Sequence, residues 1–369
     1  PPRSTLFPYT TLFRSWKEKI LSLWEELNET AQVIVSESRF PSAEQILSMV
    51  QKHQVDFIGC HLSHPISFEI LNIQSVKGIA TSTAGYNHIS MVPGVLITHT
   101  PSVLDKAVAD YTIALILTCL RNLVGLHNFL WEGHWSADQK WDLDENLNNT
   151  MDNLVLGIVG MGEIGREITK RLATWGIKIL YYDLVQLNDF ERMYPNVQFI
   201  PTMEEIFTQA DIVSLHIPLN NKTKKIIGEK LLKLMKPNSL LVNTARGPIV
   251  DFDALIRLLK KKEITINLAF DVYDPEPISK EILKEFHAIA AERPDIRFVF
   301  IPHNASSDAD TRAEMATILL SDLITMVKSK SIDDLKTLRL IPEQRKLKKA
   351  DVDASNEIQQ YRIKSWWVT

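Results

Sequence analysis

The sequence predicts an α/β fold with two domains, each built around a parallel sheet. At 369 residues the chain is longer than a single hydrophobic core normally supports. Short β-rich runs alternate with helical patterns, and this alternation is typical of βαβ units. From residue 154 onward the predicted strands are almost continuously apolar, as expected for a parallel sheet with helices on both faces.

The composition is that of an ordinary globular protein, with 45% hydrophobic and 23% charged residues. A net charge of -4 provides no basic excess for neutralising phosphates, so we expect no nucleic-acid partner. The most apolar run, Tyr111–Leu120, is shorter than the roughly 20 residues that span a bilayer, so we expect no membrane association and interpret it as a buried or dimer-facing helix. Cys60 and Cys119 form no CxxC or Cys/His pattern, which predicts no metal site and fits a cytoplasmic protein.

Residues 1–15 are expected to lie outside the fold. Thr5–Ser15 reads TLFPYTTLFRS, which is the translation of a widely used short-read sequencing adaptor. We therefore interpret residues 1–15 as an artefact and exclude them from the fold prediction. The alternative interpretation is a genuine aromatic-rich arm.

The first domain is predicted from one helical pattern and four short strands. Trp16–Leu27 carries apolar residues at helical spacing. The β-rich runs that follow are separated by helical stretches, which indicates a small open α/β domain. These runs are residues 33–35, 55–58, 78–80 and 95–97.

The second domain is predicted from a long helix, Ala107–Leu120, and a new series of strands. The strands are residues 154–159, 178–182, 212–216, 240–243, 268–272 and 298–301. Beyond them, residues 336–369 show no clear periodicity, and we interpret this segment as a solvated tail.

A glycine-rich motif, GxGxxG, directly follows the first strand of this second series and opens a predicted helix, Glu163–Trp175. In such a motif Gly160 allows a tight turn, Gly162 lets the backbone approach a pyrophosphate, and Gly165 permits close packing of helix on strand. The helix N-terminus attracts the negative charge. Alone, the motif is weak evidence, because glycine turns also occur for packing reasons.

Asp183 strengthens the prediction of a dinucleotide site. It ends the next apolar strand, where a carboxylate can accept hydrogen bonds from the adenosine ribose hydroxyls. A 2′-phosphate would be repelled there, and Leu184-Val185-Gln186 supplies no cation to offset the repulsion. NAD is therefore favoured over NADP, with a simple turn residue as the alternative interpretation of Asp183.

Three further residues suggest the chemistry of a ketone reduction. Arg246 ends a strand, where a guanidinium could bind a carboxylate through two hydrogen bonds and polarise a keto oxygen. His303 could supply the proton that a developing alkoxide requires, and Glu276 could hold the imidazole ring. Taken singly, Arg246 could be a surface cap and His303 a structural histidine.

These motifs occur in the order found in the D-isomer-specific 2-hydroxyacid dehydrogenase family, which the chain resembles over roughly residues 17–330. The matching segments are GIVGMGEIG, LHIPLNNKTKKIIG, LMKPNSLLVNTARGPIVDFDAL, AFDVYDPEP and IPHNAS. The resemblance implies two Rossmann-like or flavodoxin-like domains, in which a central NAD-binding, doubly wound parallel sheet (102–303) is inserted into a smaller substrate domain (16–101 with 304–335). The family's first substrate-domain strand precedes the helix at 16–27, so we expect that strand to be absent or replaced.

The resemblance also implies roles for individual residues. Arg246 would bind the substrate carboxylate and carbonyl, His303 would donate the proton, and Glu276 would be its partner. The helix at 107–120 resembles the one that the family uses in a homodimer.

Two further sets of residues take their expected roles from the resemblance. The backbone N–H groups of Thr83, Ala84 and Gly85 would hold the substrate carboxylate, together with Arg246. The cofactor-binding positions would be Gly160, Gly162, Glu163, Ile164, Gly165, Asp183, Ile217, Pro218, Thr223, Thr244, Ala245 and Asp271.

The predicted function is interconversion of a small 2-keto acid and its D-2-hydroxy acid with NAD (NADH) as cofactor. Glyoxylate and hydroxypyruvate rank first because the loop STAGYNHI resembles that of their reductases. They are followed by 3-phosphoglycerate and D-lactate. Glu276 disfavours the related formate-oxidising branch, which typically carries Gln there. The alternatives are an NAD-sensing corepressor of the same fold and a nucleotide-binding domain that has lost its activity.

Overall fold

The structure is a computed structural model that describes residues 4–7, 18–136, 147–330 and 333–348. The chain divides into two compact units, and we describe each by itself. Unit 1 comprises residues 1–104 and 307–369, and unit 2 comprises residues 105–306. Both junctions lie three residues later than predicted, at 105 rather than 102 and at 306 rather than 303.

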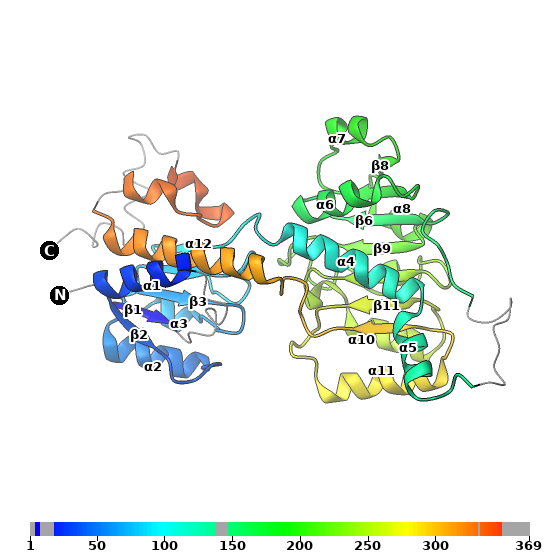
Figure 1. Cartoon of the computed structure of the whole chain (residues 1–369), viewed down its shortest axis with the longest axis horizontal. Helices are drawn as coiled ribbons and strands as arrows, with labels where there is room; N and C mark the ends of the chain where they lie inside the picture. The colour runs from blue at the N-terminus through cyan, green and yellow to red at the C-terminus, as the bar shows by residue number, and fades with distance from the viewer. Residues whose placement is uncertain (1–3, 8–17, 137–146, 331–332, 349–369) are drawn as a thin grey trace. The chain divides into compact units, whose positions relative to one another are not determined.

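Unit 1 contains a five-stranded parallel sheet with the order β2-β1-β3-β4-β5. This is the flavodoxin-like order, in which the chain changes direction between β1 and β3. Helices α1 and α12 pack against each other along the sheet (Figure 1). The strands are β1 (Ser4–Phe7), β2 (Gln32–Val35), β3 (Phe57–Cys60), β4 (Gly78–Thr81) and β5 (Leu96–Thr98), and the helices are α1 (Glu18–Thr30), α2 (Ala43–His53), α3 (Phe68–Leu71) and α12 (Ala309–Lys328).

The exclusion of residues 1–15 from the fold is wrong for Ser4–Phe7. These residues form β1, which lies between β2 and β3 and pairs with both in parallel register. Residues 1–3 and 8–15 lie outside the described residues. A strand is therefore present at the place where the family's first strand was expected to be absent or replaced. The replacement is physically possible because a parallel ladder is formed by backbone groups, which any extended segment without proline can supply.

The prediction of a solvated tail is wrong for residues 336–345. Two short 3-10 helices, η3 (Asp333–Thr337) and η4 (Pro342–Lys348), flank a buried stretch that contains Leu338, Leu340 and Ile341. Leu340 forms an antiparallel bridge with Thr98 of β5. The apolar residues here are too few to show a period, which is why sequence patterns missed the contact. Residues 349–369 lie outside the described residues.

Unit 2 contains a seven-stranded parallel sheet with the order β12-β11-β10-β9-β6-β7-β8, of which Figure 1 labels β8, β6, β9 and β11 from top to bottom. Its strands match the predicted ones closely, apart from β8, which was not predicted. The order is that of a doubly wound Rossmann-like sheet, which changes direction between β6 and β9. The strands are β6 (Val155–Val159), β7 (Lys178–Tyr182), β8 (Val197–Phe199), β9 (Ile212–Leu215), β10 (Leu240–Asn243), β11 (Asn267–Phe270) and β12 (Phe298–Phe300).

Both faces of this sheet are covered, as its apolar strands predict. Leu241 of β10 belongs to one buried cluster, while its neighbours Leu240 and Val242 belong to the opposite one. Successive side chains of a strand point to opposite faces, so two separate cores require helices on both sides. The helical elements are α4 (Asp105–Leu120), α5 (Leu123–Trp131), α6 (Glu163–Leu172), α7 (Asn188–Met193), α8 (Met203–Gln209), α9 (Glu229–Leu232), η2 (Gly247–Ile249), α10 (Phe252–Lys260) and α11 (Lys280–Glu292).

Several helices begin at side-chain caps that the sequence supplies. Asp251 accepts the Ala254 N–H at the start of α10, and Ser279 accepts the Ile282 N–H at the start of α11. Among the described residues no single helix is long and apolar enough to cross a membrane. The helices α4 and α5 pass that test only as a pair, and they are bent by 61° where they meet.

Candidate active site

The glycine-rich loop follows β6 at the point where the unit 2 sheet changes direction. Ligands of open α/β sheets bind outside the carboxyl ends of the strands at such a point. Ile217 and Pro218 follow β9, the neighbour of β6 on the other side of this point. The fold thus places the two predicted nucleotide-binding segments at the ends of adjacent strands.

The three glycines of the motif have different backbone environments. Gly160 has a φ of 101°, and a Cβ there would lie 2.8 Å from the carbonyl oxygen of His216. At Gly165 a Cβ would lie 2.5 Å from the carbonyl oxygen of Gly160, so only glycine lets α6 pack so closely. Gly162 caps α6, and within the described residues a Cβ there would meet nothing within 4 Å. A pyrophosphate fits this open helix N-terminus.

Asp183 follows β7 and contacts the glycine loop directly. Its carboxylate accepts the backbone N–H of Met161 at 2.7 Å and that of Leu184 at 2.6 Å. A negative charge therefore lies at the loop, where it would repel a 2′-phosphate. This position suits the ribose of a dinucleotide that lacks such a phosphate.

The loop after β9 is closed by Thr223. Its hydroxyl donates to the carbonyl of Pro218 at 2.6 Å and accepts the N–H of Asn220 at 2.8 Å. These bonds draw together two of the predicted cofactor positions. Glu163 and Ile164 lie in the first turn of α6, beside the glycine loop.

The loop that carries Arg246 is held by Asn243, a buried residue at the end of β10. The Asn243 side chain accepts the N–H of Ala245 at 3.0 Å and donates to the carbonyl of Arg246 at 2.9 Å. The backbone of Gly247 lies directly against the backbone of Tyr273, since a Cβ at Gly247 would lie 1.8 Å from the Tyr273 carbonyl oxygen. Sequence reasoning gave Asn243 no role, although a polar residue at the end of an apolar strand was a visible sign of one.

Arg246 is half-buried, and its guanidinium donates to the carbonyl of Ala245 at 2.7 Å. Burial lowers the pKa of Arg246, and the charge of Glu276 opposes that shift. Thr244 is buried, and its hydroxyl bonds that of Thr112 in α4 at 2.9 Å.

Asp271 connects the Arg246 loop to the His303 loop. Its carboxylate is fully buried and accepts the N–H groups of Asn304 at 2.7 Å and Ala305 at 2.9 Å. Its own N–H donates to the Asn243 carbonyl at 3.0 Å, and its carbonyl accepts the His303 N–H at 2.8 Å. Burial raises the pKa of Asp271, and the two amide bonds oppose that rise. Tyr273 adds a second link, because its hydroxyl donates to the Ile301 carbonyl at 2.9 Å.

His303 and Glu276 form an ion pair through His303 Nδ1 and Glu276 Oε1. The backbone of His303 has a φ of 49°, an uncommon conformation that the bonds to Asp271 hold in place. Both side chains remain accessible, with 25% of His303 and 32% of Glu276 exposed. With Nδ1 engaged, Nε2 is the ring nitrogen left to act on a ligand.

The predicted substrate loop, Thr83, Ala84 and Gly85, lies in unit 1 directly after β4. The Thr83 carbonyl accepts the Thr100 N–H at 3.0 Å, and the Ala84 carbonyl is bonded by His99 Nδ1 at 2.8 Å. Thr83 and Thr81 are also joined through their hydroxyls at 2.9 Å. The loop is therefore anchored on one side to the end of β5.

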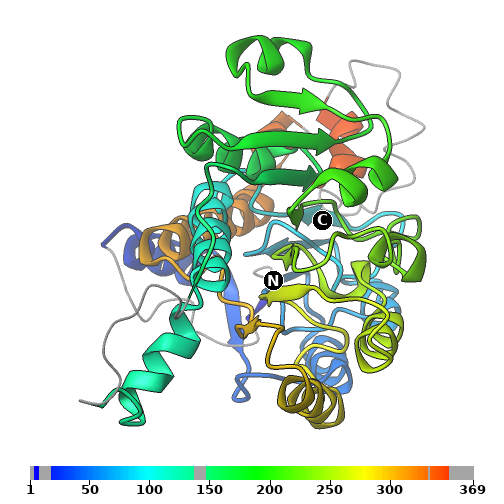
Figure 2. The ribbon, with the colours of Figure 1, turned by 90° about the vertical axis from the view of Figure 1, so that its right-hand side faces the viewer.

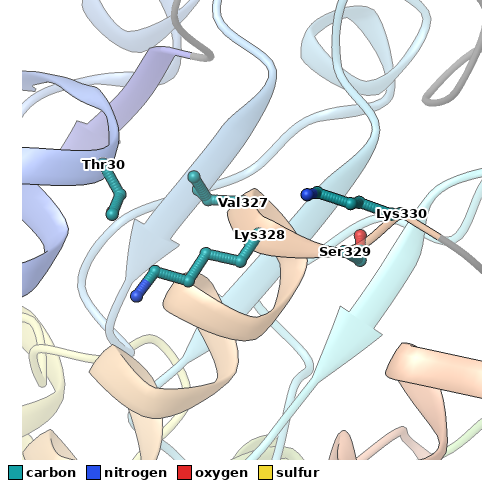
Figure 3. A pocket seen from close by; sticks show the side chains of 5 residues that line it. All are labelled: Thr30, Val327, Lys328, Ser329 and Lys330. Carbon is teal, nitrogen blue, oxygen red and sulfur yellow. The ribbon is translucent and has the colours of Figure 1, made fainter.

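A hollow at the C-terminal end of α12 contains none of the predicted site residues (Figure 3). Two of its polar side chains already have partners within the chain. Ser329 donates to the Met326 carbonyl at 2.8 Å, and Lys328 pairs with Glu26 at 2.5 Å. Among the described residues no group of three or more His, Cys, Asp or Glu side chains could hold a metal ion.

Comparisons with known proteins identify the family of the chain. Residues 113–305 match the family described as D-isomer specific 2-hydroxyacid dehydrogenase, NAD binding domain. A glyoxylate reductase of Thermofilum pendens is 34% identical over 310 residues, covering 82% of this chain and 87% of that protein. A second, from Thermococcus litoralis, is 34% identical over 281 residues, covering 74% and 81%.

Solved structures show the same architecture. The crystal structure of a glyoxylate reductase from Paecilomyes thermophila matches with a TM-score of 0.75 and 26% identity, covering 93% of this chain and 99% of that one. A D-lactate dehydrogenase from Aquifex aeolicus, complexed with NAD and lactic acid, has the same fold at a TM-score of 0.72 and 23% identity, covering 91% and 98%.

The fold and the site define an NAD-binding oxidoreductase with two α/β domains. The chain belongs to the D-isomer-specific 2-hydroxyacid dehydrogenase family. Its unit 2 is the NAD-binding domain of that family, and its class of reaction is the interconversion of 2-keto and 2-hydroxy acids.

Proposed function

We propose that this enzyme reduces glyoxylate or hydroxypyruvate with NADH, using Arg246 and His303 as its catalytic residues. The observation that supports this most directly is the Glu276–His303 ion pair, located on loops that Asp271 ties to the Arg246 loop. Such an arrangement offers one fixed cation and one proton donor to the same ligand. The glyoxylate reductases among the relatives favour these two substrates over 3-phosphoglycerate and D-lactate.

Each residue has a distinct part in the reaction. Arg246 binds the carboxylate and polarises the keto oxygen, and its interaction strengthens as negative charge develops on that oxygen. The bound cofactor supplies the hydride to the carbonyl carbon. His303 donates a proton from Nε2 to the oxygen as the alkoxide forms. Glu276 binds the Nδ1–H, which fixes the ring orientation and stabilises the imidazolium before transfer.

The cofactor is held by the residues around the point where the unit 2 sheet changes direction. The open N-terminus of α6 at Gly162 would receive the pyrophosphate, and the Asp183 carboxylate would accept hydrogen bonds from the ribose hydroxyls. The negative charge of Asp183 favours NADH over NADPH. The remaining contacts come from Gly160, Glu163, Ile164, Gly165, Ile217, Pro218, Thr223, Thr244, Ala245 and Asp271.

We also propose that Thr83, Ala84 and Gly85 hold the substrate carboxylate through backbone N–H groups. In the described part of the chain the N–H groups of Ala84 and Gly85 donate to no other group. Two adjacent free amides make a suitable site for a carboxylate. In this proposal unit 1 supplies the backbone N–H groups for the substrate carboxylate, and unit 2 supplies Arg246, His303 and the cofactor-binding residues.

A second copy of the chain is the proposed partner. All of α5 is at least partly exposed, and it carries four exposed large apolar residues: Leu123, Val124, Leu130 and Trp131. Figure 2 shows this helix extending away from the unit 2 sheet. An apolar surface of this kind marks an interaction site. A homodimer would cover it, and light scattering of wild type and of Trp131→Glu tests this.

The two buried free cysteines suit a cytoplasmic enzyme.

The function is tested by following NADH absorbance with glyoxylate, hydroxypyruvate, pyruvate and phosphohydroxypyruvate. We expect turnover to be fastest with the first two. His303→Gln should lower kcat by about 10²–10⁴-fold, the usual contribution of a general acid. Arg246→Ala should lower kcat/KM strongly, and Glu276→Gln should have a smaller effect than His303→Gln.

NADH binding without turnover of any keto acid would contradict the proposal. That result would favour one of the two alternatives, a corepressor-like binding protein of the same fold or a nucleotide-binding domain that has lost its activity. Unchanged turnover in His303→Gln would disprove only the role of His303 as the proton donor and would leave the proposed reaction standing.

A further inference from the structure

His99 is a buried residue just beyond β5, and it contacts the substrate loop. Its Nδ1 lies 2.8 Å from the carbonyl oxygen of Ala84. A carbonyl oxygen only accepts hydrogen bonds, so Nδ1 must carry the proton. Within the described residues Nε2 is buried without a hydrogen-bond partner, and burial lowers the pKa of His99. Both observations indicate a neutral imidazole with a fixed tautomer.

The bond from His99 fixes the direction of the next amide. The peptide bond between Ala84 and Gly85 is trans, and in a trans peptide the C=O and N–H point in opposite directions. Because the Ala84 carbonyl points to His99, the Gly85 N–H points away from it. The preceding peptide is held in the same way, since the Thr83 carbonyl accepts the Thr100 N–H at 3.0 Å.

A second connection reaches the loop through Tyr86. Its ring meets the His99 ring edge-on, with centroids 5.6 Å apart. Its hydroxyl donates to the two carboxylate oxygens of Glu343, at 3.0 and 2.9 Å. Glu343 belongs to η4, and the neighbouring Gln344 accepts the Ile97 N–H at 2.8 Å. The segment after α12 therefore supports Tyr86 from the outside while Tyr86 covers His99.

We propose that His99 is a positioning residue, which aims the Gly85 N–H at the substrate carboxylate by holding the Ala84 carbonyl. Tyr86 and Glu343 keep His99 in place. The inference rests on the proposed function, because it assumes that the loop binds a 2-keto acid. In this proposal His99 acts on the substrate only through the Ala84 carbonyl.

The test compares His99→Ala, which removes the donor, with His99→Asn, whose side-chain N–H₂ can replace Nδ1–H. Steady-state kinetics with glyoxylate give KM and kcat, and fluorescence titration gives the Kd of NADH. We expect His99→Ala to raise KM about tenfold, equivalent to about 1.4 kcal/mol. We expect His99→Asn to restore KM to within about twofold of wild type, and the NADH Kd to stay constant in both.

A purely structural role for His99 predicts a different outcome. Both variants would then lower the melting temperature while KM stayed at the wild-type value, and that result would overturn the proposal. So would an equal rise of KM in His99→Ala and His99→Asn, because the restored donor would then have no effect. Tyr86→Phe should raise KM less than His99→Ala, since it removes only the outer support.

Hydrogen exchange separates this inference from the proposed function. If wild type reduces no keto acid, the proposed function fails, and the exchange of the amides of residues 83–86 still tests the anchoring. Faster exchange in His99→Ala than in His99→Asn supports the role of His99 in fixing the loop. Equal exchange in the two variants overturns it.

Discussion

The central strands of the two sheets, β6 in unit 2 and β1 in unit 1, occupy equivalent places in their folds. Each lies where its sheet changes direction. In β6 the sequence VLGIV is apolar and leads into the glycine loop. In β1 the sequence STLF places a fully buried Thr5 between two strands, and in the described part of the chain its hydroxyl has no partner. Backbone pairing can therefore hold a strand in the interior of a sheet even where a buried side chain, here Thr5, does not suit the position.

The largest expected effect comes from Gly165→Ala, which tests how tightly the β6 region is specified. The new Cβ would lie 2.5 Å from the Gly160 carbonyl oxygen, so α6 must move away from the loop. Overpacking of this kind costs about 1–3 kcal/mol, which lowers the melting temperature of a domain this size by about 2–12 °C. NADH affinity should fall as well, as measured by fluorescence titration.

Gly162→Ala is the matched control, because within the described residues a Cβ there meets nothing within 4 Å. We expect wild-type melting with weaker NADH binding, since the methyl group occupies the space proposed for the pyrophosphate. Equal melting of the two variants would contradict the close packing inferred at Gly165.

A smaller effect is expected from Asp105→Asn, which tests the repulsion between the carboxylates of Asp105 and of Glu163 in α6. Burial, followed by the hydrogen bond and charge of Glu163, raises the pKa of Asp105 to about 7. The folded protein therefore holds a proton that the unfolded chain releases. Wild-type stability should fall as pH rises from about 4 to 7 and then level off. The variant cannot ionise, so its gain in melting temperature should grow over that window, reaching about 2–5 °C at pH 8.

Asp110→Asn on the same helix is the contrasting variant. The Asp110 carboxylate pairs with Arg171 at 2.5 Å, so its loss should not stabilise the protein at any pH. A gain for Asp105→Asn that is the same at pH 5 and pH 8 would show that ionisation of Asp105 causes no conflict.

The smallest expected effect, from Thr5→Val, addresses β1 directly. Valine has the shape of threonine without the hydroxyl, and removing an unsatisfied buried hydroxyl should stabilise unit 1 by about 1 kcal/mol, or about 2–4 °C. Thr112→Val in unit 2 should do the opposite, because the Thr112 hydroxyl bonds the Val108 carbonyl at 2.7 Å and the Thr244 hydroxyl at 2.9 Å. Destabilisation by Thr5→Val would indicate a hydroxyl partner for Thr5 and remove the contrast between the strands.

The same contrast explains what the sequence could predict. Unit 2 combines apolar strands, a glycine motif and polar residues at strand ends, so its sheet and the Glu276–His303 pair could be predicted. The role of β1 could not, since nothing in STLF identifies a central strand. The bonds of Asp271 to Asn304 and Ala305 were also missed, because they join residues more than thirty positions apart through backbone groups. The burial of Leu338 and Ile341 depends on a partner strand that only the fold brings near.

The pairing of β5 with residues 339–344 also has a consequence for solubility. Strand β5 is the last in its sheet, and its outward backbone groups all have partners in this segment. The His99 N–H donates to the Arg339 carbonyl at 3.0 Å, and the Ile97 carbonyl accepts the Ile341 N–H at 3.1 Å. The Gln344 side chain accepts the Ile97 N–H at 2.8 Å and donates to the Val95 carbonyl at 2.9 Å. A chain cut before residue 338 would expose an open edge strand, which is a template for aggregation.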